Sequence, residues 1–281
     1  MPTDAEIDGF LAVAIDLARW AVDEIAGHRL LPAEIETKEN AADYVTIVDR
    51  AVERQVRDVI AERFPGHLVV GEEFGDESTG AADGELIWYV DPVDGTTNFV
   101  FGLPWSSFSL GLADAEGPLV GVVADPHRGE IISAARGRGA FVRTPQGKEA
   151  ARCARTTELM GAVVLTEWAA FRPWPGLLEM MVRLSEQGAT TRIMGSSALS
   201  VASAAIGRGS AAVLGGYNTW DVIAAVLIAR EAGAVVLGRN GDAAAAVPHV
   251  GDGGLLVSAP AIAPKLWSAW TGGGDVTEQP V

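Results

Sequence analysis

The stretch that decides the fold is residues 86–99, Leu-Ile-Trp-Tyr-Val-Asp-Pro-Val-Asp-Gly-Thr-Thr-Asn-Phe. Its first five residues, Leu86 to Val90, are apolar and β-prone, which predicts a strand buried on both faces of a sheet. We expect this strand to stop at Asp91-Pro92 and the chain to turn again at Asp94-Gly95, because both pairs are typical of turns. One of the two threonines that follow can cap a helix.

This turn would place two carboxylates, Asp91 and Asp94, at the carboxyl end of a strand beside free backbone N–H groups. Carboxylates bind hard cations, whereas the N–H groups at a helix start bind anions. Together they predict a metal-assisted phosphate site. A structural turn is the alternative, because Asp-Pro and Asp-Gly are common turn pairs and an aspartate suits the first turn of a helix.

The composition of the chain argues against several classes of binding partner and metal site. The chain has 281 residues and a formal net charge of −16, which argues against non-specific binding to nucleic acid or anionic membranes. A phosphorylated substrate stays possible, because a bound metal reverses the local field. Cys153 is the only cysteine, and the four histidines lack zinc-ligand spacing. The acidic N-terminus and short apolar runs predict a soluble cytoplasmic protein.

The rest of the chain predicts an α+β half over residues 1–145, an α/β half over residues 146–271 and a disordered tail over residues 272–281. In the first half we expect helices at 3–27 and 46–64, a strand at 67–70, a mobile loop at 74–85 and an antiparallel meander over 105–142. The polar stretch 36–43 shows no clear period. In the second half we expect strands at 162–166, 211–214, 234–237 and 255–258, and helices at 175–186, 196–206, 219–232 and 261–270.

The central string resembles the Asp-Pro-(Ile/Leu/Val)-Asp-Gly-Thr-x-Asn-Phe signature of the inositol monophosphatase family, which belongs to the lithium-sensitive, magnesium-dependent phosphatases. Three further segments resemble this family in the same order: Lys38-x4-Asp43-x-Val45-Thr46-x-x-Asp49, Gly71-Glu72-Glu73, and Trp220-Asp221 with Glu231-Ala232-Gly233. The resemblance runs from about residue 5 to residue 270. It implies a layered αβαβα fold of the fructose-1,6-bisphosphatase kind, a homodimer, and hydrolysis of a phosphate monoester with Mg²⁺.

The resemblance also implies roles for individual residues. One metal would be held by Glu72, Asp91 and the Val93 carbonyl, a second by Asp91, Asp94 and Asp221, and a third through waters by Asp49. Thr96 and Glu72 would orient a metal-activated water, with Asp94 also needed for turnover. The N–H groups of Gly95, Thr96 and Thr97 would hold the phosphate, and the substrate-side residues would be Lys38, Gly195, Ser196, Ser197 and Asp221. Glu73 is a weaker candidate that would support the ligands indirectly.

Each of these residues also has a structural interpretation. Glu72 and Lys38 could be solvated surface residues, and Asp49 and Asp221 could be acids that favour the start of a helix. Ser196 could cap a helix. Because the carboxylates match four signatures in order, we favour the metal site over two non-enzyme alternatives, a catalytically silent binding protein and a structural Ca²⁺-binding protein.

The substrate that the resemblance favours is myo-inositol monophosphate, because Thr97-Asn98-Phe99 is similar to the inositol phosphatases. Those enzymes, however, usually carry a glutamate several residues before Trp-Asp that contacts the sugar hydroxyls. Residues 213–218 contain no acid here, and Gly215 or Gly216 lies nearest the expected position. A missing polar partner can change selectivity strongly. Histidinol phosphate, fructose 1,6-bisphosphate and 3′-phosphoadenosine 5′-phosphate are therefore alternative substrates.

Overall fold

The strand predicted from Leu86 to Val90 lies inside the larger of two main sheets in a computed structural model. The model describes residues 2–28, 31, 34–38, 43–76, 86–168, 173–245, 247–249 and 252–273. The strand, β5 (Ile87–Asp94), pairs in parallel with β3 (Leu68–Gly71) and antiparallel with β6 (Ser107–Asp114). Its apolar side chains Trp88 and Val90 are fully buried, as expected for a strand covered on both faces.

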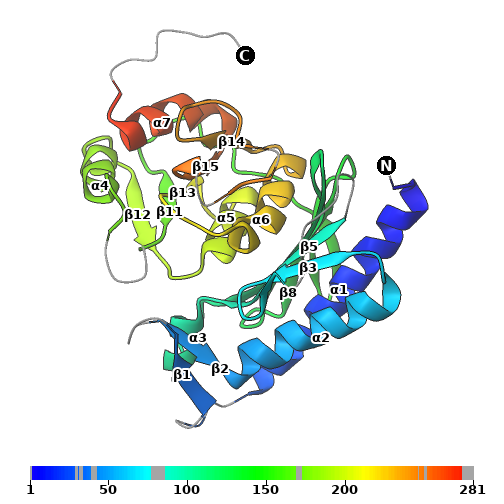
Figure 1. The fold of residues 1–281 in the computed structure, drawn as a ribbon. Helices are drawn as coiled ribbons and strands as arrows, with labels where there is room; N and C mark the ends of the chain where they lie inside the picture. The colour runs from blue at the N-terminus through cyan, green and yellow to red at the C-terminus, as the bar shows by residue number, and fades with distance from the viewer. Residues whose placement is uncertain are drawn as a thin grey trace.

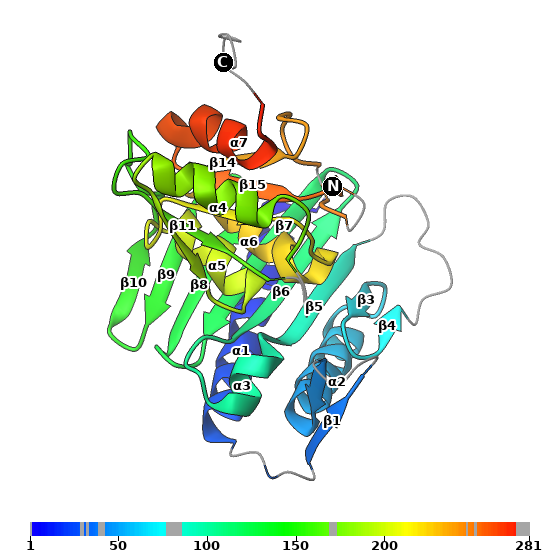
Figure 2. The same ribbon diagram turned by 90° about the vertical axis from the view of Figure 1, so that its left-hand side faces the viewer.

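The sheet around β5 has eight strands in the order β10-β9-β8-β7-β6-β5-β3-β4 (Figure 2). The predicted meander forms β6 to β9, each antiparallel to the next along the chain, and β10, which was not predicted, adds a further antiparallel strand at the edge. The remaining bounds are β4 (Gly75–Asp76), β7 (Gly117–Asp125), β8 (Glu130–Ala135), β9 (Ala140–Thr144) and β10 (Gly147–Ala150).

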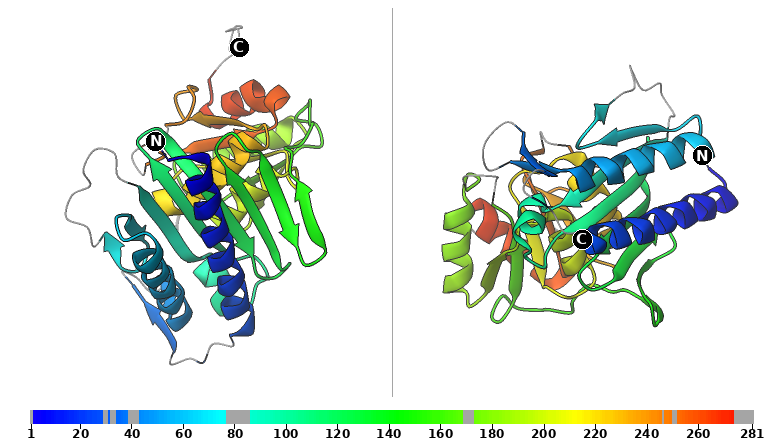
Figure 3. Two further views of the ribbon diagram at one scale, coloured as in Figure 1. Left: turned by 90° about the vertical axis from the view of Figure 1, so that its right-hand side faces the viewer. Right: turned by 90° about the horizontal axis from the view of Figure 1, so that it is seen from below.

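Two amphipathic helices cover one face of this sheet, as Figure 3 shows. They are α1 (Asp4–Gly27) and α2 (Ile47–Arg63), and each begins with a complete capping box, Thr3 with Glu6 and Thr46 with Asp49. The capping pairs satisfy backbone N–H groups that the first turn leaves free. Both predicted helices are confirmed, and their apolar stripes form one core with the inner face of β5, β6 and β7.

The second sheet has five strands in the order β12-β11-β13-β15-β14. Its first three strands run parallel, whereas β15 lies antiparallel to both β13 and β14. The bounds are β11 (Val163–Thr166), β12 (Thr190–Ile193), β13 (Ala211–Leu214), β14 (Val235–Gly238) and β15 (Leu255–Ser258). Of these, only β12 escaped prediction.

Helices α5 (Ser197–Ala205) and α6 (Thr219–Glu231) lie between the two sheets (Figure 1). Glycines let α6 approach the first sheet closely: a Cβ atom on Gly111 would lie 2.7 Å from Ile223 Cγ2, and one on Gly121 would lie 2.7 Å from the Ala224 carbonyl oxygen. Helices α4 (Leu177–Glu186) and α7 (Ala263–Thr271) cover the outer face of the second sheet, and α7 follows a short 3₁₀ helix, η3 (Pro260–Ile262). The order of layers is therefore αβαβα, as predicted.

Two expectations about the first half were wrong. Strand β5 does not stop at Asp91-Pro92 but continues to Asp94, and its pairing with β6 shifts between Asp91↔Ser109 and Asp94↔Ser107. This β-bulge accommodates Pro92, which has no N–H group for a regular ladder. The expectation that Thr96 or Thr97 caps the next helix was also wrong, because α3 (Thr96–Phe101) has Gly95 as its N-cap and no side-chain cap hydrogen bond. The polar stretch 36–43 lies between two short strands at its ends, β1 (Ile35–Thr37) and β2 (Tyr44–Thr46), which form a two-stranded sheet.

The remaining expectations can be compared only in part. Most of the loop predicted to be mobile, residues 77–85, and most of the predicted tail, residues 274–281, lie outside the described residues. Within the described part of the chain, no helix is both long enough and apolar enough to cross a membrane.

Candidate active site

A cavity of about 380 Å³ lies where the carboxyl end of β5 meets the second half of the chain. It is lined by most of the residues predicted for the site: Glu72, Asp91, Val93, Asp94, Gly95, Thr96, Thr97, Gly195, Ser197 and Asp221. Lys38, Asp49 and Ser196 do not line it but contact residues that do. A larger cavity of about 640 Å³ near the start of α1 contains none of the predicted site residues.

Asp91 is a buried carboxylate in the cavity with an unsatisfied oxygen atom. Its side chain is 2% exposed, and its Oδ1 atom has no hydrogen-bond partner among the described residues. Burial, followed by the negative charges of Glu72, Asp94 and Asp221, raises the pKa of the Asp91 carboxyl well above its usual range. A buried carboxylate with an unsatisfied oxygen is costly unless a positive charge compensates it. This corner of the cavity therefore fits a cation.

Asp94 connects the two halves of the molecule. Its Oδ2 atom accepts hydrogen bonds from the Ser196 hydroxyl and from Ala198 N at 2.7 Å, and its Oδ1 atom accepts from Ser197 N at 3.2 Å. The carboxylate thus sits at the N-terminus of α5, where free N–H groups favour negative charge. Burial nevertheless raises the pKa of Asp94 to about 6. Ser196 is also the N-cap of α5, which confirms its structural interpretation.

A close backbone contact joins the same two halves. Gly95 and Gly195 both have positive φ angles, +87° and +88°, which glycine adopts without strain. A Cβ atom on Gly95 would lie 2.6 Å from the Gly195 carbonyl oxygen, and one on Gly195 would lie 2.7 Å from Asn98 Nδ2. The buried Asn98 amide also donates to Met194 O and Trp105 O, each at 2.7 Å. Any larger side chain at either glycine would push the two loops apart.

Glu72 lies in the turn after β3 and is ion-paired with Lys38. Lys38 Nζ is 2.8 Å from Glu72 Oε1 and 2.6 Å from Glu73 Oε1. Burial opposes the charge on Lys38, but the two carboxylates outweigh it and raise the pKa of the ammonium group. Burial raises the pKa of Glu73 to about 7 despite this contact. Neither Glu72 nor Lys38 is therefore an isolated surface residue.

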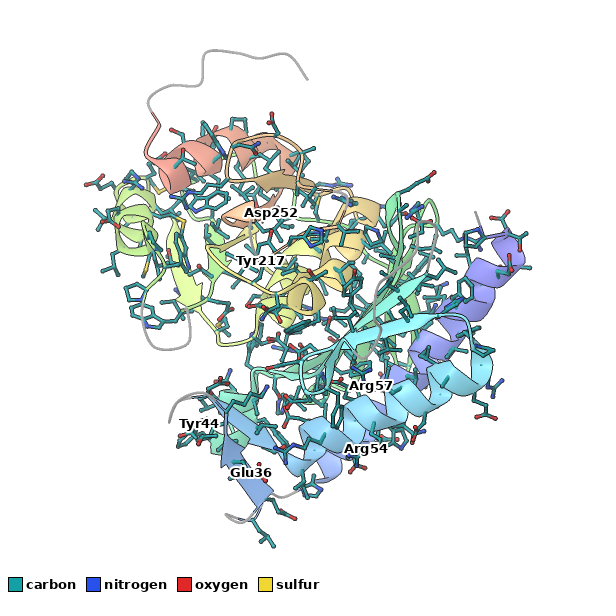
Figure 4. All side chains as sticks on the ribbon, viewed as in Figure 1. Glu36, Tyr44, Arg54, Arg57, Tyr217 and Asp252 are labelled. Carbon is teal, nitrogen blue, oxygen red and sulfur yellow. The ribbon has the colours of Figure 1, made fainter. Side chains whose placement is uncertain are left out.

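The turn that carries Glu72 is held by Glu53, a fully buried carboxylate on α2. Glu53 accepts hydrogen bonds from Glu73 N at 2.7 Å and Phe74 N at 3.2 Å, and it is ion-paired with Arg57 at 2.8 Å. Figure 4 shows Arg57 between α2 and the sheet. Gly71 leaves room for this carboxylate, since a Cβ atom there would lie 2.2 Å from Glu53 Oε1.

Asp49 lies behind the cavity wall. It is fully buried and accepts hydrogen bonds from Thr46 N at 2.8 Å and from the Thr46 hydroxyl at 2.5 Å, as a capping acid does. Burial raises the pKa of Asp49 to about 6. Thr96 Oγ1 lies 3.2 Å from Asp49 Oδ1 and 2.9 Å from the Val93 carbonyl oxygen. Asp49 thus reaches the cavity through Thr96.

Asp221 comes from the second half, in the first turn of α6. Its Oδ2 atom accepts a 2.7 Å hydrogen bond from Asn218 N, which completes the capping box of that helix. Burial, followed by the charge of Asp94, raises the pKa of Asp221 well above its usual range. Asp221 therefore adds negative charge to the same cavity as Asp91 and Asp94, as the sequence predicted.

The sequence reasoning missed Glu167, which also lines the cavity. Glu167 follows β11, is 8% exposed, and accepts hydrogen bonds from Gly195 N and the Ser200 hydroxyl. Burial raises the pKa of Glu167 to about 8. The signal was available in the sequence, because an acid directly after a buried strand was the reason for choosing Glu72 and Asp91.

The carboxylates fit Mg²⁺ in chemical type, because this cation prefers oxygen ligands. Among the residues that the structure describes, no three Asp, Glu, His or Cys side chains already surround a common point as a metal site does. The carboxylates have other partners instead: Asp94 accepts hydrogen bonds from the start of α5, and Glu72 forms an ion pair with Lys38. The unsatisfied oxygen of Asp91 remains available for a cation.

The comparisons with known proteins agree with this geometry. The model of the inositol monophosphatase family matches residues 6–271. The chain belongs to the inositol monophosphatase family. The resemblance stated from the sequence is thus confirmed, and with it membership of a family of phosphomonoesterases.

Individual members of the family are similar over most of their length. The chain is 35% identical over 259 residues to a Pasteurella multocida protein named Nus factor SuhB, covering 91% of this chain and 93% of that protein. It is 35% identical over 240 residues to the inositol-1-monophosphatase SuhB of Mycobacterium tuberculosis, covering 84% and 80%. Among solved structures, Thermotoga maritima IMPase TM1415 gives a TM-score of 0.82 at 29% identity, covering 94% and 97% of the chains.

Proposed function

We propose that this chain hydrolyses a small phosphate monoester with Mg²⁺ held by its acidic cavity. The observation that carries the proposal is the buried Asp91, whose unsatisfied oxygen lies among the negative charges of Glu72, Asp94 and Asp221. Family membership supports the same reaction class. A site that gathers four carboxylates has no evident use in stabilising the fold, because like charges repel.

The expected ligands are those given by the resemblance: Glu72, Asp91 and the Val93 carbonyl for one ion, and Asp91, Asp94 and Asp221 for another. Asp94 can contribute because its Oδ1 atom accepts only one long hydrogen bond. Asp49 would act on a third ion only through waters. Bound Mg²⁺ would neutralise the phosphate and lower the pKa of a water.

The chain's own groups would then orient the reactants. Gly95, Thr96 and Thr97 line the cavity at the start of a short helix, and the N–H groups of this turn would hold the phosphate oxygens. The Thr96 hydroxyl, fixed between Val93 and Asp49, would orient the attacking water, and the Glu72 carboxylate would accept its proton. Water would attack phosphorus while Glu72 accepts its proton, and the bond between phosphorus and the ester oxygen would break. The leaving alkoxide would take a proton from solvent water, and Glu72 would later return its proton to solvent.

The first substrate to test is myo-inositol 1-phosphate, because relatives at about 35% identity are named for inositol monophosphate hydrolysis. Phosphate release would be measured with Mg²⁺, and again with a chelator, for this ester, histidinol phosphate, fructose 1,6-bisphosphate and 3′-phosphoadenosine 5′-phosphate. We expect Mg²⁺-dependent release from at least one ester and none from any ester with Asp94→Asn. Absence of release from every ester would favour the silent binding protein instead.

A further inference from the structure

The part of the cavity wall formed by the segment before Trp220 differs from what a polyol pocket needs. Residues 213–218 precede Trp220-Asp221, and of these only Asn218 lines the cavity. Val213, Leu214 and Tyr217 are buried in the core. This wall therefore offers no carboxylate from that segment to accept hydrogen bonds from several hydroxyl groups.

An indole ring occupies the space beside this segment. A Cβ atom on Gly215 would lie 2.1 Å from Cδ2 of Trp174, so no side chain can replace this glycine without moving the ring. Trp174 is 5% exposed, and its Nε1 donates a 2.9 Å hydrogen bond to the Glu167 carbonyl oxygen. This hydrogen bond holds the backbone of Glu167, and with it the position of the next residue along the chain.

The next residue is Trp168, which lines the cavity and is 42% exposed. A tryptophan normally buries most of its large apolar surface, and its exposure inside a functional cavity indicates a binding surface. The cavity has a second aromatic residue, Tyr44 on β2, from the opposite half of the chain. Figure 4 shows Tyr44 beside the two-stranded sheet, and its ring packs edge-on against that of Phe101 with 6.0 Å between the centroids.

We infer that Trp168 binds the alcohol portion of the substrate by stacking, and that this portion carries a planar aromatic or heteroaromatic ring. This inference rests on the proposed phosphatase activity and names its substrate class. The phosphate lies against the Gly95–Thr97 turn, and the ring of the leaving alcohol lies against the indole. A flat ring gains stacking energy against the indole. A puckered polyol ring presents only C–H groups to the indole, and residues 213–218 offer its hydroxyl groups no carboxylate.

Two matched esters test this inference. Benzyl phosphate and cyclohexylmethyl phosphate differ in the flatness of the ring but share a primary alcohol as leaving group. With Mg²⁺ we expect kcat/KM to be about fivefold higher for benzyl phosphate, the range that aromatic pairing supports. Trp168→Ala should remove this preference, Trp168→Phe should keep most of it, and Trp20→Ala, an exposed tryptophan on α1, should leave it unchanged.

A binding measurement separates the two proposals. Benzylphosphonate and cyclohexylmethylphosphonate cannot be hydrolysed, so their dissociation constants report stacking without turnover. We expect benzylphosphonate to bind about fivefold more tightly, and only when residue 168 is aromatic. Equal binding of the two phosphonates, or a preference that survives Trp168→Ala, would overturn the inference. Failure to hydrolyse any ester would overturn the proposed function, and phosphonate binding would still decide the role of Trp168.

Discussion

Replacing Glu53 by glutamine should loosen the turn that carries Glu72. The Glu53 carboxylate accepts from Glu73 N through Oε2 and from Phe74 N and Arg57 through Oε1. A glutamine can keep only one acceptor oxygen, so its NH₂ group would face either a backbone N–H or a guanidinium. Losing one buried, charge-assisted hydrogen bond costs about 1.5–3 kcal/mol.

This cost should appear in both stability and metal affinity. A loss of about 2 kcal/mol lowers Tm by roughly 4–8 °C for a chain of this size class. Because residues that support metal ligands change metal affinity about 10–100-fold, the Mg²⁺ concentration for half-maximal phosphate release should rise at least tenfold. The assays are thermal and urea denaturation without metal and a Mg²⁺ titration of activity.

Glu62→Gln is the matched control, since Glu62 is exposed on the same helix. It should change the free energy of unfolding by less than about 0.5 kcal/mol and leave the Mg²⁺ titration unchanged. If Glu53→Gln were as stable as Glu62→Gln and bound Mg²⁺ equally well, the argument that Glu53 positions the Glu72 turn would be refuted.

Three further predictions follow from the same contacts. Lys38→Met should lower the Mg²⁺ concentration for half-maximal activity about threefold or more, because the Lys38 ammonium group competes with Mg²⁺ for Glu72. The control is Lys265→Met, because Lys265 forms an exposed ion pair with Glu158. An unchanged Mg²⁺ titration of Lys38→Met would contradict the prediction. Gly195→Ala should lower Tm by several degrees and activity at least tenfold, since its Cβ would meet Asn98; Gly216→Ala, where nothing lies within 4 Å, should do neither. Glu167 has its pKa raised to about 8, so the native state holds a proton that the unfolded state loses from about pH 4.5 upward. The contribution of Glu167 to stability should therefore fall between about pH 5 and 8. In chelator, Glu167→Gln should make the decrease of Tm over that pH range less steep. An identical dependence of Tm on pH in both proteins would contradict the raised pKa of Glu167.

The sequence predicted most elements because their signals are local. Alternating and periodic apolar residues mark the meander, α1 and α2, and the caps Thr3 and Thr46 mark the starts of those two helices. Gly233 marks the end of α6, which is apolar on all sides. The end of β5 was not predictable in this way. Pro92 argues against a strand, but the bulge opposite Ser107–Ser109 removes the need for its N–H group, and only the pairing with β6 reveals this.

The sequence predicted which residues form the candidate site better than it predicted the contacts that these residues make. Glu72 and Asp91 could be chosen by their positions after strands, and Asp221 by the family resemblance. The cavity does gather Glu72, Asp91, Asp94 and Asp221. Their partners could not be chosen, because the ion pair of Lys38 with Glu72 and the contact of Asp94 with α5 join residues far apart in sequence. Glu167 was missed although it carries the same signal.

The most direct test of the central claim is a Mg²⁺ titration of phosphate release from the best ester of the panel, with the wild-type chain and Asp91→Asn. We predict saturable activation of the wild type, complete loss of release in chelator, and no activation of Asp91→Asn at any Mg²⁺ concentration, while urea denaturation shows the variant folded. Equal release by both proteins, or release by the wild type in chelator, would contradict the claim that the buried carboxylates act through a bound cation.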